Sequence, residues 1–165
     1  MATATLIDFP KTSEVLERYG QEFIELYKLN LANSGRSASG GLVDSLRYNV
    51  VLNDTTFAVD ISLRDYWKYI EDGTRPHWPP LSAIRQWIDV KPVIPRPFSN
   101  GKLPSPDQLA FLISRKIATV GTEGSHDFER ANNELFERMQ MSIAEAVTED
   151  LNAQVEYIFT EFAHR

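Results

Sequence analysis

Residues 46–63 read LRYNVVLNDTTFAVDISL, and this stretch gives the clearest indication of the fold. Apolar and polar residues alternate on either side of the turn formers NDTT, which is the period of a half-buried β-strand. The apolar positions that form one predicted face are Leu46, Tyr48, Val50, Leu52, Phe57, Val59, Ile61 and Leu63. A two-stranded hairpin is marginal in water by itself, so helices elsewhere in the chain must cover that face.

Helical periodicity is found on both sides of this hairpin. Residues 12–33 carry apolar side chains at intervals of three and four, with Thr12 or Ser13 as the expected N-cap. Residues 33–41 are rich in glycine and serine and are predicted to form a flexible loop. Residues 125–163 carry one apolar stripe without Pro or Gly, so part of it must pack on another chain, or the helix must break near residues 148–150.

The middle of the chain alternates between short helices and proline-rich loops. Helices are predicted for residues 64–72, 81–88 and 105–121, and an extended loop for residues 91–104, which hold four prolines. Ser105 is expected to cap its helix, whose buried face should hold Leu109, Leu112, Ile113, Lys116 and Ile117. The predicted fold is α+β: one domain with a small antiparallel β-sheet (hairpin about 43–63) flanked by helices, including an N-terminal helix and a long C-terminal helix.

Composition excludes several classes of site. The 165 residues include 17 basic and 23 acidic side chains, for a net charge of −6, and no cysteine, so disulfides and thiolate metal sites are excluded. Residues 35–120 have a net charge of +3 and residues 121–165 a net charge of −7, which argues against a dedicated DNA-binding domain. We expect no secretory signal, because the N-terminus lacks a basic and an apolar region.

No set of residues indicates catalysis. Ser125, His126 and Asp127 are consecutive and cannot converge as a catalytic triad does. His77 with Glu71 or Asp72 is a weak alternative, as a metal site or as the base of a hydrolase, because adjacent carboxylates on a helix do not face one another. We therefore expect no catalytic residue, no metal and no cofactor.

An aromatic and basic segment is the strongest candidate for a site. It spans residues 64–87, and its basic residues are Arg64, Lys68, Arg75 and Arg85. The aromatic residues between them and after them are Tyr66, Trp67, Tyr69, Trp78 and Trp87. They can serve as an interface, as core residues, or as a platform for single-stranded nucleic acid. The candidate interface residues are Tyr66, Trp67, Arg75, Pro76, His77, Trp78 and Trp87, and the candidate turn or hinge residues are Gly40, Gly41 and Gly73. Arg75 is the expected contact to a neighbour's carboxylate, because its guanidinium can bind both oxygens.

The order of motifs resembles a known family. The motifs are SGGLVDSL at residues 39–46, YWKYIEDGTRPH at 66–77, WPP at 78–80, IRQWI at 84–88 and AFLISRKIATVGT at 110–122, followed by Phe128. They resemble those of the neck proteins of tailed bacteriophages, called head–tail joining or tail-completion proteins. Residues 42–121 are the part similar to the family.

The resemblance implies a structural virion protein without enzymatic activity. Such a subunit forms a hexameric or dodecameric ring in the neck between capsid and tail, after synthesis in the host cytoplasm. Its expected partners are copies of itself, portal-side connector proteins, and tail-tube or tail proteins. Genomic DNA is expected to pass through the ring without sequence-specific binding, and no membrane is involved. The alternative is a small phage-encoded nucleic-acid-binding module that uses the Trp and Arg cluster.

Overall fold

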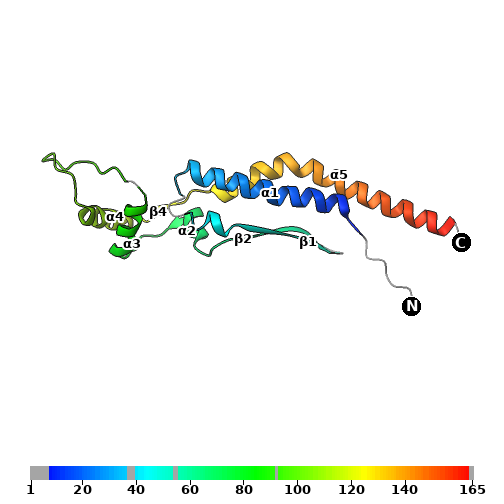
Figure 1. Cartoon of the computed structure of the whole chain (residues 1–165), viewed down its shortest axis with the longest axis horizontal. Coiled ribbons are helices and arrows are strands. Elements are labelled where there is room, and N and C mark those ends of the chain that lie inside the picture. The colour runs from blue at the N-terminus through cyan, green and yellow to red at the C-terminus, as the bar shows by residue number, and fades with distance from the viewer. Residues whose placement is uncertain (1–7, 37–39, 54–55, 92, 164–165) are drawn as a thin grey trace. The chain divides into compact units, whose positions relative to one another are not determined.

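The computed structural model describes residues 8–36, 40–53, 56–91 and 93–163. The elements are α1 (Pro10–Asn33), a short 3-10 helix (Val43–Ser45), β1 (Arg47–Asn53), β2 (Thr56–Ser62), α2 (Trp67–Glu71), β3 (Gly73–Thr74), α3 (Leu81–Val90), α4 (Pro106–Val120), β4 (Thr122–Glu123) and α5 (Asp127–Ala163). Helices and small antiparallel sheets make the α+β class that the sequence predicts (Figure 1).

The chain divides into two compact units. Unit 1 holds α1 up to Asn30, residues 46–63 and the chain from Phe128, and unit 2 holds residues 31–45 and 64–127. Some sequence predictions lie outside the described residues: those for the segment before Asp8, for residues 37–39 of the glycine- and serine-rich loop, for the turn residues Asp54 and Thr55, and for Pro92.

The hairpin of unit 1 has the predicted register. Strands β1 and β2 pair antiparallel with Val50 opposite Val59, so the apolar positions share one face. Both valines are half-buried, whereas Asn49 is exposed. A Cβ added at Gly20 of α1 would lie 2.3 Å from Cδ2 of Tyr48 in β1. Gly20 lowers helix propensity, and its absent side chain makes room for the Tyr48 ring against the helix.

On another side of α1 lies α5 (Figure 1). The Phe23 ring meets the Phe128 ring edge-on at 4.9 Å between centroids, and the Tyr27 ring lies 5.4 Å from the same Phe128 ring. Phe23 and Tyr27 are fully buried, as is Leu135 of α5. The helical stripes of α1 and of the first half of α5 therefore form the core of unit 1.

The N-terminus of α1 is capped from α5. The helix begins at Pro10, and the carboxylate of Asp150 accepts hydrogen bonds from Thr12 N at 2.7 Å, Thr12 Oγ1 at 2.7 Å and Lys11 N at 3.2 Å. Burial raises the pKa of Asp150, but these hydrogen bonds outweigh burial and hold the pKa below its ordinary value. The prediction that Thr12 or Ser13 caps the helix is wrong, because the cap is supplied by a residue 138 positions away.

Helix α5 is continuous over 37 residues, so the alternative of a break near residues 148–150 is wrong. Its apolar residues do not form one stripe. Positions that face α1 are buried as far as Ala146, but the next buried position is Asp150 rather than Leu151. Because each residue turns a helix by about 100°, the five-residue step from Ala146 to Leu151 rotates the stripe by about 140°.

The later apolar residues of α5 consequently occupy a second face. These residues are called the distal stripe, and they are Leu151, Val155, Ile158, Phe159 and Phe162. Their exposed fractions run from 45% to 72%. Asp150, on the face toward α1, is 3% exposed. The prediction of a single stripe was wrong because periodicity over short windows does not register a change of face.

Two Gly-Thr pairs, Gly73-Thr74 and Gly121-Thr122, meet where β3 and β4 form a short antiparallel sheet in unit 2. Thr74 of β3 pairs with Thr122 of β4, and their Oγ1 atoms are 2.9 Å apart. Gly73 and Gly121 have φ of 76° and 75°, in the left-handed region. A Cβ at Gly73 would lie 2.1 Å from the Thr122 carbonyl oxygen, and one at Gly121 would lie 2.0 Å from the Thr74 carbonyl oxygen. Both glycines are therefore required by the close approach of two backbones as well as by their φ angles.

Helix α4 begins as the sequence predicts. Ser105 Oγ accepts from Gln108 N at 3.3 Å, Gln108 Oε1 accepts from Ser105 N at 2.9 Å, and proline follows the cap. The predicted buried face is wrong in part, because Lys116 is exposed and the buried positions are Ala110 and Ser114. The other four residues of the predicted face, Leu109, Leu112, Ile113 and Ile117, are half-buried.

Candidate protein-binding surface

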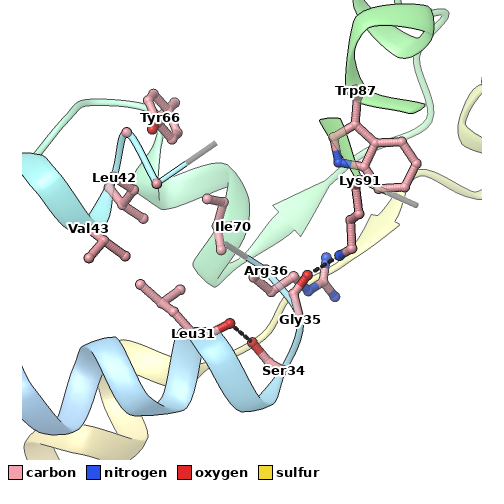
Figure 2. A pocket seen from close by; sticks show the side chains of 12 residues that line it. Leu31, Ser34, Gly35, Arg36, Leu42, Val43, Tyr66, Ile70, Trp87 and Lys91 are labelled. Carbon is pink, nitrogen blue, oxygen red and sulfur yellow. Dashed lines mark hydrogen bonds between the residues drawn. The ribbon is translucent and has the colours of Figure 1, made fainter. Parts of the chain in front are cut away.

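A cavity of about 570 Å³ lies within unit 2 (Figure 2). It is lined by Leu31, Ser34, Gly35, Arg36, Gly40, Gly41, Leu42, Val43, Tyr66, Ile70, Trp87 and Lys91. Lys91 Nζ donates a hydrogen bond to the Gly35 carbonyl oxygen and lies 5.6 Å from the centre of the Trp87 ring. This lysine therefore joins the end of α3 to the loop that follows α1, with its charge beside an aromatic face.

A larger depression, here called the α3–α4 groove, shares Trp87 and Arg36 with that cavity. Its volume is about 810 Å³, and its lining residues are Arg36, Ile84, Trp87, Val93, Ile113, Lys116, Ile117, Val120, Gly121, Thr122 and Glu123. Arg36 Nη2 donates to the Glu123 carbonyl oxygen at 2.9 Å. Val120 is 63% exposed and Trp87 37% exposed, so part of the apolar lining faces solvent.

The segment between β3 and α3 is exposed. Arg75, Pro76 and His77 lie on the surface, and His77 Nδ1 is 2.9 Å from the Arg75 carbonyl oxygen. Trp78 is 54% exposed, and its ring lies 5.9 Å from the ring of Phe111 in α4. The loop therefore presents a cation and a large aromatic ring on the outside of unit 2.

The predicted interface residues fall into two groups. Tyr66 and Trp87 lie in the wall of the cavity, together with Gly40 and Gly41. Arg75, Pro76, His77 and Trp78 lie in the exposed loop, whereas Trp67 is half-buried. Sequence analysis did not single out three residues that accompany these groups, namely Arg36, Lys91 and Phe111. Arg36 and Phe111 lie on other elements, and no local spacing relates them to the aromatic segment. Lys91 follows Trp87 by four positions at the end of α3, a spacing that could have indicated its contact with the ring.

The residues considered for catalysis have structural contacts. Ser125 N donates to the Ile70 carbonyl oxygen at 2.9 Å, and His126 N donates to the Glu71 carbonyl oxygen at 3.2 Å. The fully buried Asp127 accepts from Ser34 Oγ at 2.6 Å. These bonds hold the chain at the start of α5 against α2 and the end of α1. Among the residues that the structure describes, His77 belongs to no cluster of three potential metal ligands.

The described helices include none that is long and apolar enough to span a bilayer. No protein-family model, curated protein or solved structure matches this chain.

Proposed function

We propose that this chain is a structural virion protein of a tailed bacteriophage, a ring subunit in the neck that completes the tail attachment site and joins the DNA-filled capsid to the tail. It acts by binding neighbouring proteins and catalyses no reaction. The observation that carries the proposal is the exposed aromatic and apolar surface of unit 2.

The burial of large side chains supports a protein-binding role. The large aromatic and apolar residues of unit 2 that have exposed fractions between 37% and 66% include Tyr66, Tyr69, Trp78, Leu81, Trp87 and Phe111. Exposed apolar patches commonly mark surfaces that bind other proteins. Trp, Tyr and Arg are the residue types enriched among those that dominate binding energy, and Arg75 lies in the same segment.

The Gly-Thr pairing supports the same role. Residues 75–121 leave β3 and return to β4, so the pairing of Thr74 with Thr122 closes the base of this segment. A segment held at its base loses less conformational entropy on binding than a free one. The Gly-Thr motifs on which the resemblance depends therefore have a structural reason: they fix the frame that presents the exposed surface.

The test is assembly of a phage that carries Arg75→Ala together with Trp78→Ala. Both residues are exposed, so the variant should fold, and each truncation should cost about 1–3 kcal/mol per interface if the residue is a hot spot. We expect heads and tails that fail to join, while the control Arg18→Ala, an exposed arginine on α1, assembles normally. Normal yields of infectious particles containing the double variant would refute the assignment of this surface.

One observation favours the nucleic-acid-binding alternative. The cavity holds Arg36 and Lys91 beside Trp87 and Tyr66, which is a combination of cations and aromatic rings that suits phosphates and stacked bases (Figure 2). Titration with single-stranded DNA, followed by tryptophan fluorescence, should then show affinity that falls steeply with salt. Absence of binding at low salt would exclude this alternative.

A further inference from the structure

We infer that the distal stripe of α5 docks into the α3–α4 groove of a second copy of this chain. The inference rests on the proposed function, because it assigns the surfaces by which ring subunits contact one another. The contact is head-to-tail: one copy supplies a helix and the next supplies a groove.

The distal stripe has the spacing of a helix that binds in a groove. Leu151, Val155, Ile158 and Phe162 stand at positions i, i+4, i+7 and i+11, which is the pattern of anchors in such recognition. Their exposed fractions are 45%, 49%, 49% and 72%. Asp150 faces α1 with its carboxylate bonded to Thr12, so the stripe points away from the packing that holds α5 in unit 1.

The charges of the two surfaces are complementary. From Met139 to Ala163, α5 contains no Lys or Arg and five acidic residues, Glu145, Glu149, Asp150, Glu156 and Glu161. Glu156 and Glu161 are exposed, and in the sequence they lie between stripe residues Val155 and Phe162. The groove holds Arg36 and the exposed Lys116 beside its apolar lining, against one exposed carboxylate, that of Glu123, so its lining has a net positive charge. Acidic side chains around an apolar helix face and basic side chains around an apolar groove favour their mutual approach.

The length of α5 keeps the distal stripe out of the groove of its own chain. The groove includes Glu123, and three residues separate it from Asp127, where α5 begins. Leu151 lies 24 residues further along a continuous helix, or about 36 Å at 1.5 Å per residue. The intervening chain from Glu123 to Asp127 spans at most about 14 Å, so α5 cannot turn back to bring its stripe into its own groove. A contact between two different surfaces of identical chains forms a closed ring when the rotation that relates neighbouring copies is a whole-number fraction of 360°.

Two variants separate the partners in this contact. The stripe variant carries Val155→Asp and Ile158→Asp, and the groove variant carries Lys116→Glu and Val120→Asp. All four positions are exposed, so each variant should keep the circular dichroism and melting temperature of the wild type. Leu29→Asp, at a position of α1 that is 56% exposed, is the control for placing aspartate on an apolar surface position.

Light scattering on a sizing column, together with electron microscopy, gives the readout. We expect rings from the wild type and the control, and monomers from each variant alone. An equimolar mixture of the two variants should give dimers and no larger species, because the intact stripe of one variant meets the intact groove of the other. If aspartate unfolds the stripe variant, Val155→Asn with Ile158→Asn replaces it and the same results are required.

The results distinguish this inference from the proposed function. Rings from either variant would overturn the docking contact while leaving the ring subunit proposal standing. A mixture that stays monomeric would also overturn the pairing of these two surfaces. A wild-type protein that stays monomeric at every concentration would overturn both proposals.

Discussion

Replacement of Asp150 by alanine should destabilise the folded protein more than replacement of any exposed acidic residue of α5. Its carboxylate accepts three hydrogen bonds from Lys11 and Thr12, and Thr12 is fully buried. Loss of a helix cap costs about 0.5–2 kcal/mol, and hydrogen bonds to charged groups contribute about 1.5–3 kcal/mol each. Since these contributions overlap, we expect a loss of about 2–4 kcal/mol in the free energy of unfolding.

Urea unfolding at pH 7, followed by far-UV circular dichroism, measures this loss. Asp150→Asn keeps the shape and one acceptor oxygen, so its loss should be smaller than that of Asp150→Ala. Glu145→Ala is the matched control, because Glu145 is an exposed carboxylate on the same helix. Equal unfolding free energies for Asp150→Ala and Glu145→Ala would refute the cross-helix cap.

The pH dependence gives a second test with a definite sign. The pKa of Asp150 is lowered in the folded protein, so the folded state favours the charged carboxylate. Its contribution is therefore fully present above the ordinary pKa of about 3.9 and is lost as the pH falls through the lower folded value. The stability difference between wild type and Asp150→Asn should be constant from pH 7 to 5 and shrink below about pH 4. A difference that grows on acidification would contradict this account.

The remaining predictions concern the frame of each unit. Gly73→Ala should lower the melting temperature severely, because the added Cβ meets the backbone of β4. Gly101→Ala is the control: its φ is also positive, at 77°, but nothing lies within 4 Å of the added Cβ, so it should show the cost of the φ angle alone. Equal melting temperatures for the two variants would refute the role of the backbone contact. Val59→Asp places a charge on the half-buried face of the hairpin and should lower the free energy of unfolding by several kcal/mol. Asn49→Asp, at an exposed position, should lower it only slightly. Similar losses for the two variants in thermal unfolding would mean that the register is wrong. Ser105→Ala should cost about 1 kcal/mol through loss of the capping box, as measured by urea unfolding, and no change would argue against the cap.

Features that depend on neighbouring residues were predictable from the sequence. The hairpin follows from alternation within residues 46–63, and the start of α4 follows from Ser105, its proline and Gln108. Both signals are local, because a strand's face and a helix's cap are set by residues a few positions apart. The aromatic and basic segment was likewise visible in composition. Its residues from Arg75 to Trp78 are exposed, and its role as an interface stays a prediction.

Features that depend on distant residues needed the folded chain. The Thr74 and Thr122 hydroxyls meet across 48 positions, and Asp150 caps a helix that begins 140 residues earlier, at Pro10. No periodicity relates such residues, because their proximity arises from packing rather than from spacing. The face of α5 that carries Leu151 is the clearest case: a list of apolar residues continues one stripe, whereas burial of Asp150 against α1 shows that the stripe has changed sides. Amino-acid order thus indicates which segments are helix or strand and which are rich in aromatic residues, and three-dimensional packing establishes which of their faces are exposed.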